Sequence, residues 1–77
     1  MKTTRKQLVT FAIRLVKEIA TQNKNIKVDY KNNYVNVWFH DDDESELISL
    51  YPFYSLKENK QLFKKAILKI RGEWYDL

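Results

Sequence analysis

The dipeptide Asn32-Asn33 is the feature that most restricts how this 77-residue chain can fold. Asparagine tolerates positive φ better than most residues, so two asparagines between extended segments are typical of a two-residue hairpin turn. A turn at this point fixes the register of the flanking strands. That register forms one fully apolar face from three cross-strand pairs, which are Ile26 with Phe39, Val28 with Val37 and Tyr30 with Val35.

The opposite face of the predicted hairpin is mixed, because the same register pairs Lys27 with Trp38, Asp29 with Asn36 and Lys31 with Tyr34. Aromatic rings are common anchors of protein interfaces. Rings flanked by lysines also suit single-stranded nucleic acid, since bases stack on rings and ammonium groups meet phosphates. A third interpretation is that Trp74-Tyr75 or a second copy covers Trp38. The predicted partner-binding residues are Lys27, Lys31, Tyr34, Trp38 and, beyond the hairpin, Tyr51.

Helical spacing of apolar residues predicts a first helix over residues 4–22, where Thr4 and Gln7 fit a capping box. Its apolar positions are Leu8, Phe11, Ala12, Leu15, Val16 and Ile19. Further apolar residues at Val9, Ile13 and Ala20 widen this stripe beyond what a three-stranded sheet usually covers. We therefore expect part of the stripe to meet a second helix, a partner or a second copy of the chain.

A second helix is predicted after Ser55, whose hydroxyl can cap the helix start while Glu58, three residues later, completes a capping box. Gly72 lies near the end of this helix. Its apolar positions are Leu56, Phe63, Ala66, Ile67, Ile70 and Trp74. The segment 46–53 suits either a third strand or a short helix capped by Asp43, and Pro52 would end either. We favour the strand. The prediction is a single α+β domain over residues 1–77, ordered α-β-β-β-α, with an antiparallel meander and both helices on its apolar face; the alternative order is α-β-β-α-α.

Charge is distributed unevenly along the chain. The net charge is +4, with eight Lys or Arg among residues 1–31, and a compact acidic loop follows the hairpin at Asp41, Asp42, Asp43, Glu44 and Glu46. In the second helix, spacings of three, four and seven residues place four cations on one stripe opposite the core, which are Lys57, Lys60, Lys64 and Arg71. Such a stripe is usually a solvated face, but it also suits nucleic acid or an acidic protein surface.

Catalytic signatures are scarce. His40 is the single histidine and cysteine is absent, so no triad can be assembled by spacing. His40 beside Asp41–Asp43 could ligate a divalent ion or act as the base of a nuclease, but the loop lacks the pattern of an EF-hand. We expect no metal, no cofactor and no enzymatic activity. Arg14 and Lys17 interrupt the N-terminal apolar residues, which argues against a signal peptide or membrane span and favours a cytoplasmic protein.

Two resemblances carry further expectations. The predicted order of elements, with Lys57, Lys60, Lys64 and Lys65 in the last helix, is similar to the double-stranded-RNA-binding domain, whose final helix places lysines on phosphates. The sequence departs from that family at Ser55-Leu56-Lys57-Glu58, which has an acid where the family has a base, so the similarity concerns element order alone. Eleven Lys against three Arg, with one glycine, resembles small proteins of phages and mobile elements. Those include anti-CRISPR and other anti-defence inhibitors, which occupy a surface of a host complex.

These patterns together favour a non-enzymatic binding protein that occludes or bridges a protein or nucleoprotein partner, of the kind that inhibits a host defence complex. The positive net charge argues against mimicry of DNA by the whole molecule, although the acidic loop over residues 41–46 could mimic phosphates locally. The first alternative is a nucleic-acid-binding domain that uses the lysines and Trp38. The second is a small nuclease centred on His40.

Overall fold

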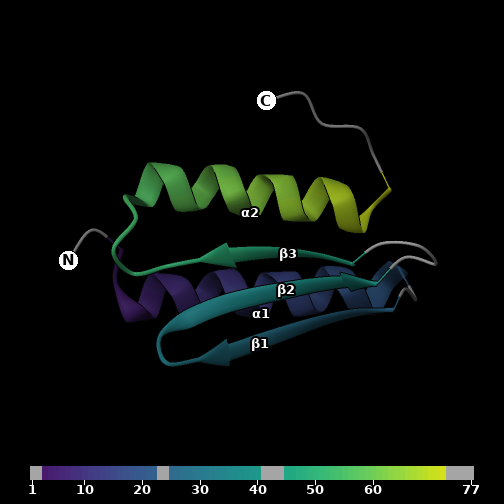
Figure 1. Cartoon of the computed structure of the whole chain (residues 1–77), viewed down its shortest axis with the longest axis horizontal. Coiled ribbons are helices and arrows are strands. Elements are labelled where there is room, and N and C mark those ends of the chain that lie inside the picture. Colours follow the sequence, from purple (N-terminus) through teal and green to yellow (C-terminus); the bar gives the residue numbers. More distant parts are fainter. Residues whose placement is uncertain (1–2, 23–24, 41–44, 73–77) are drawn as a thin grey trace.

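Two helices flank a three-stranded antiparallel sheet in the order α-β-β-β-α, as the sequence predicts (Figure 1). The computed structural model describes residues 3–22, 25–40 and 45–72. The elements are α1 (Arg5–Gln22), β1 (Ile26–Lys31), β2 (Tyr34–His40), β3 (Ser45–Leu50) and α2 (Leu56–Ile70). Strand β2 lies in the centre of the sheet, so β1 and β3 are its two edges.

The hairpin between β1 and β2 has the predicted turn and register. Asn32 and Asn33 adopt φ of 54° and 65°, the positive values that a two-residue turn of this kind requires. Val28 lies opposite Val37, and Lys27 lies opposite Trp38. Because side chains alternate between faces, this register places every apolar pair on one side of the sheet and leaves the mixed pairs on the other.

The segment after the hairpin is a third strand rather than a helix, and it pairs with β2 so that Ile48 lies opposite Val37. It ends at Leu50, earlier than the predicted end at Phe53. The chain then turns, and the Tyr54 N–H donates to the Tyr51 carbonyl over 3.2 Å. Pro52 sits at the second position of this turn, where its fixed φ suits the backbone. The turn carries three aromatic residues to the end of the sheet.

Both helices pack on the apolar face and close one core (Figure 1). The predicted caps form: the Gln7 N–H donates to the Thr4 hydroxyl over 3.1 Å, and the Glu58 N–H donates to the Ser55 hydroxyl over 3.1 Å. Gly72, at φ 73°, follows the end of α2. The buried apolar residues are Leu8, Phe11, Ala12, Leu15, Val35, Val37, Phe39, Ile48, Leu50, Phe63, Ala66 and Ile70.

The apolar stripe of α1 is only partly covered. Val16, which helical spacing assigns to the core stripe, is 53 % exposed, and Ile13 is 51 % exposed. The placement of Val16 in the core is wrong because the buried centre of the helix lies between Leu8 and Leu15, and Val16 points about 90° away from it. Trp74 and Tyr75 lie outside the described residues. Neither described helix is long and apolar enough to cross a membrane.

Candidate partner-binding face

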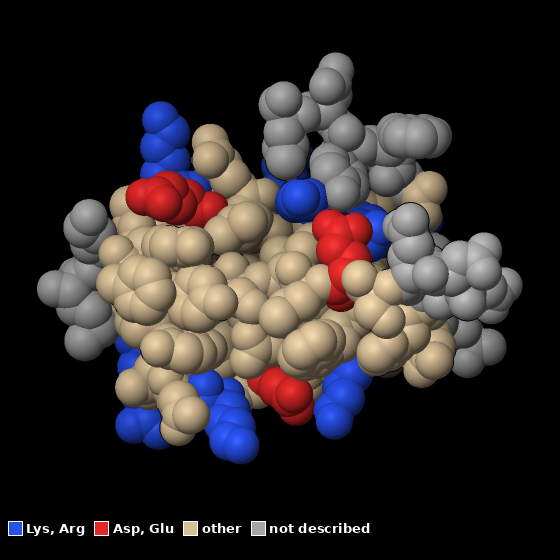
Figure 2. All heavy atoms as spheres, in the orientation of Figure 1, with Lys and Arg blue, Asp and Glu red and all other residues tan. Residues whose placement is uncertain are grey.

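The face of the sheet turned away from the helices carries three cross-strand rows. The first row is Lys27, Trp38 and Leu47; the second is Asp29, Asn36 and Ser49; the third begins with Lys31 and Tyr34. Figure 2 shows this side of the molecule as a broad uncharged area with Lys, Arg, Asp and Glu around its margins. The structure thus brings the predicted residues Trp38, Tyr34, Lys27 and Lys31 onto one face, and their role in binding stays a prediction.

Four aromatic rings form a cluster at the end of this face where β3 meets the turn. The cluster consists of Tyr34, Tyr51, Phe53 and Tyr54. Tyr51 is its centre: its ring stacks on Phe53 with centroids 4.9 Å apart and meets Tyr34 edge-on at 4.8 Å. Edge-to-face and offset-stacked rings at these distances attract one another beyond simple area burial. The cluster still faces solvent, since Phe53 is 56 % exposed and Tyr34 is 37 % exposed.

A buried polar group beneath the cluster fixes the turn that carries it. The Asn59 side chain is fully buried in α2; its amide N–H₂ donates to the Tyr51 carbonyl over 2.8 Å, and its carbonyl accepts from the Tyr51 N–H over 3.2 Å. The same amide donates to the Thr3 hydroxyl, which in turn donates to the Tyr54 carbonyl. Because these groups satisfy one another inside the protein, the backbone of residues 51–54 is held in one conformation.

Sequence reasoning identifies Tyr34 and Tyr51 but misses Phe53, Tyr54 and Asn59. A strand extended to Phe53 hides the turn that gathers the rings. Asn59 resembles an ordinary exposed residue between the charged Glu58 and Lys60, yet it lies four and seven residues before Phe63 and Ala66, on the buried side of the helix. The sequence did carry a signal for Asn59, because it is a polar residue at a core position of the apolar stripe of α2. Such a residue needs a hydrogen-bonding partner inside the protein.

The acidic loop contributes one described side chain, Glu46, which faces α2 and not the open sheet. Its carboxylate pairs with Lys69 at 2.8 Å and approaches Lys65 at 3.9 Å. This ion pair links β3 to α2, so Glu46 has a role within the fold. The predicted acidic residues Asp41, Asp42, Asp43 and Glu44 lie outside the described residues.

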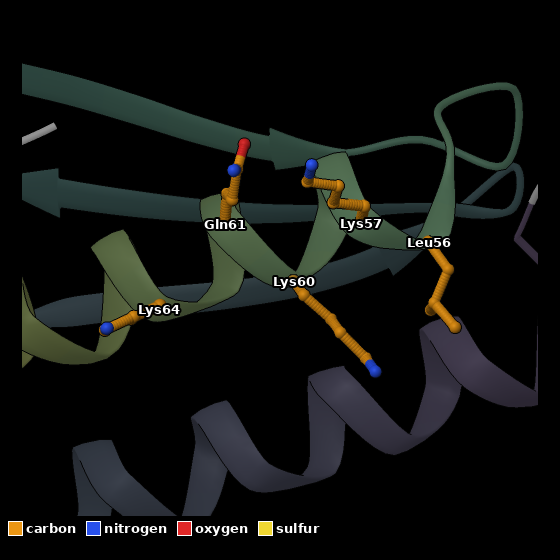
Figure 3. A pocket seen from close by; sticks show the side chains of 5 residues that line it. All are labelled: Leu56, Lys57, Lys60, Gln61 and Lys64. Atoms are coloured by element: carbon orange, nitrogen blue, oxygen red, sulfur yellow. The ribbon is translucent and has the colours of Figure 1, made fainter.

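The basic stripe of α2 is divided. Lys57, Lys60 and Lys64 line a shallow depression of about 480 Å³ together with Leu56 and Gln61. Figure 3 shows that their ammonium groups spread apart: Lys60 extends towards α1 and Lys57 extends on the other side of α2. Such divergent cations suit an extended anionic surface better than one small anion.

Arg71, the fourth predicted member of the stripe, pairs with Glu18 of α1 at 2.7 Å. The hydrogen bond from this guanidinium holds the pKa of Glu18 below its ordinary value of 4.5. Arg71 therefore joins the ends of the two helices as well as adding to the positive charge of this side.

His40 is exposed at the end of β2, opposite Ser45. Among the residues that the structure describes, no three His, Cys, Asp or Glu side chains lie close enough together to hold a metal ion. The predicted alternative of a site between His40 and Asp41–Asp43 depends on residues outside that described part. No family model matches the chain, and comparison with curated proteins and with solved structures finds no match.

Proposed function

We propose that this protein is a non-enzymatic binding module that occludes or bridges a protein or nucleoprotein partner through the open face of its sheet. The observation that carries the proposal is the aromatic cluster, whose central Tyr51 is anchored by both backbone groups to the buried Asn59. A surface held rigid before binding loses little conformational entropy when a partner docks. The cluster is therefore suited to act as the energetic centre of an interface.

The rest of the face has the composition of a protein interface. Leu47 is 43 % exposed beside Trp38 in the adjacent strand, which adds a second apolar area at the opposite end of the sheet from the cluster. Between them lie Asn36 and Ser49, joined by a 2.7 Å hydrogen bond. Aromatic anchors surrounded by polar groups are typical of interfaces in which a few residues supply most of the binding energy.

The kind of partner is proposed from the style of the sequence. Its resemblance to small phage and mobile-element proteins supports an inhibitor that covers a working surface of a host defence complex. A net charge of +4 favours a partner surface that is acidic around its margin, or one that exposes nucleic acid beside protein.

The test compares baits in affinity capture from the organism of origin, followed by a purified binding assay with the captured partner. Wild type and the Lys60→Glu, Lys64→Glu double variant should retain the same partner, whereas Phe53→Ser and Trp38→Ala should lose it while keeping the far-ultraviolet circular dichroism spectrum of the wild type. Equal retention by all folded variants would show that the open face is not the interface.

A second candidate, binding to nucleic acid, is favoured by the depression on α2 because three lysines and no acidic residue line it. Binding to phosphates releases counterions, so affinity for generic single- or double-stranded oligonucleotides would fall steeply with salt. Titration of salt between about 50 and 200 mM with such oligonucleotides separates the two functions, since an apolar interface responds weakly.

A further inference from the structure

We infer that two copies of this protein associate through the β1 edge, forming a continuous six-stranded antiparallel sheet with Val28 opposite Val28 of the second copy. Strand β1 lies at the margin of the sheet away from α2, and among the described residues it pairs with β2 on one side only (Figure 1). The two-residue turn determines which backbone groups are free. Lys31 and Tyr34 flank that turn and form a hydrogen-bonded pair, so the N–H and C=O groups of Ile26, Val28 and Tyr30 point outwards.

The charges on β1 select the register of this association. With Val28 on the twofold axis, the outward-pointing residues pair with one another, Ile26 with Tyr30 of the second copy, and all of their free backbone groups become satisfied. Lys27 then lies opposite Asp29 of the second copy, twice in the dimer. Moving the axis to Lys27 or Asp29 places like charges opposite each other, which is unfavourable. Moving it to Tyr30 leaves Ile26 beyond the paired region.

The exposed flank of α1 lies at the same edge. Phe11, Arg14 and Glu18 define the side of α1 that meets α2, through Phe63 and Arg71. At about 100° per residue, the opposite side carries Arg5 at the helix start and is otherwise apolar, comprising Val9, Ile13, Val16 and Ala20. This side therefore faces the β1 edge. Its exposure is unexplained in a single copy, since Ile13 and Val16 are both more than half exposed.

The dimer covers this flank with the same flank of the second copy. Helix α1 lies over β1 and β2. With strands about 4.8 Å apart across the new pairing, the two α1 helices would lie about 10 Å apart, close to the distance at which helices pack. The β3 edge is less suited, because Lys65 and Lys69 of α2 reach over the sheet to Glu46 of β3.

Complementary charge variants test the register. Lys27→Asp alone and Asp29→Lys alone each place like charges opposite one another, so each should shift sedimentation equilibrium towards monomer by at least about tenfold in Kd. An equimolar mixture of the two variants restores both opposite-charge pairs and should form a heterodimer. Heteronuclear NMR should show slow, concentration-dependent exchange of the Ile26, Val28 and Tyr30 amides in wild type. Failure of the mixture to associate would overturn the register.

A second pair of variants tests the helix flank. Ile13→Lys should prevent association, whereas Thr10→Lys, at an exposed position turned further from the β1 edge, should leave it unchanged; both positions are exposed, so both variants should fold. Wild type that remains a monomer up to millimolar concentration would overturn the inference. If Ile13→Lys then also failed to bind a captured partner, the exposed flank of α1 would be the binding site for a different protein and not for a second copy.

Discussion

The side-chain amide of Asn59 binds both the N–H and the C=O of Tyr51, as a neighbouring β-strand would. Strand β3 ends at Leu50, and the Asn59 amide extends the backbone hydrogen bonding by one residue, to the N–H and C=O of Tyr51. The amide also reaches Thr3 near the start of the chain. One side chain thus connects the N-terminal segment, the aromatic turn and α2.

Asn59→Ala should lower the free energy of unfolding by about 2–3 kcal/mol, because it removes one buried and two partly buried hydrogen bonds and leaves backbone groups of Tyr51 without their partner. The aromatic near-ultraviolet circular dichroism should weaken as the rings lose their fixed arrangement. Urea unfolding measures the first effect. Gln61→Ala, a change on the same helix away from the core, serves as the control and should change stability by less than about 0.5 kcal/mol. Equal stability of the two variants would contradict the role given to Asn59.

Val37→Asp should unfold the domain. Val37 is fully buried between Val28 and Ile48 in the central strand, and an unpaired carboxylate there costs several kcal/mol. That cost is comparable with the whole stability of a domain of this size. Ser49→Asp places the same charge on the open face, opposite the neutral Asn36, and should melt within a few degrees of wild type. Thermal melts followed by circular dichroism decide the matter, and a folded Val37→Asp variant would contradict the register.

The hairpin could be predicted because two independent signals coincide in it. Asn32 and Asn33 set the turn, and alternation about that turn makes every inward pair apolar, so no other register is equally consistent. The starts of both helices could likewise be predicted from local sequence, because Thr4 bonds to Gln7 and Ser55 bonds to Glu58, three residues away in each case. Such features need no knowledge of the rest of the chain.

The candidate site was predictable only in part because it depends on contacts between distant segments. Asn59 and Thr3 are 56 residues apart, and nothing local to either indicates that they meet. Phe53 and Tyr54 join the face through a turn that replaces the end of the predicted strand. Val16 fits the helical period but falls outside the area that the sheet covers, and periodicity alone cannot measure that area.

The Glu18–Arg71 pair predicts how stability depends on pH. The pKa of Glu18 is lowered in the folded protein, so its contribution is present above the unfolded value near 4.5 and is lost as the pH falls through the folded pKa. Glu18→Gln should therefore melt below wild type at neutral pH. The difference should shrink as the pH falls below 4.5 and disappear once the wild-type carboxylate is protonated.

Arg71→Gln should reproduce that pH profile, because it removes the other partner of the pair. Lys60→Gln removes the same charge from α2 at an exposed position and should run parallel to wild type at all pH values. Melting temperatures of all four proteins across the acid range provide the comparison. A constant difference between Glu18→Gln and wild type would show that the pair does not titrate as the structure indicates.

The open face and the basic side of α2 make different predictions for function. Trp38→Ala removes an anchor between Lys27 and Leu47 and should weaken partner binding by at least about 2 kcal/mol, because an interface concentrates its energy in such residues. The Lys60→Glu, Lys64→Glu double variant should alter mainly the association rate and its salt dependence.

If binding is instead to nucleic acid, the double variant should abolish it at physiological salt, and the slope of log affinity against log salt should flatten by about one unit for each phosphate that is no longer neutralised. Calorimetry or surface plasmon resonance at two salt concentrations distinguishes these results. If Trp38→Ala and the lysine double variant both keep the full biological activity while His40→Ala loses it, both binding functions are rejected in favour of a nuclease.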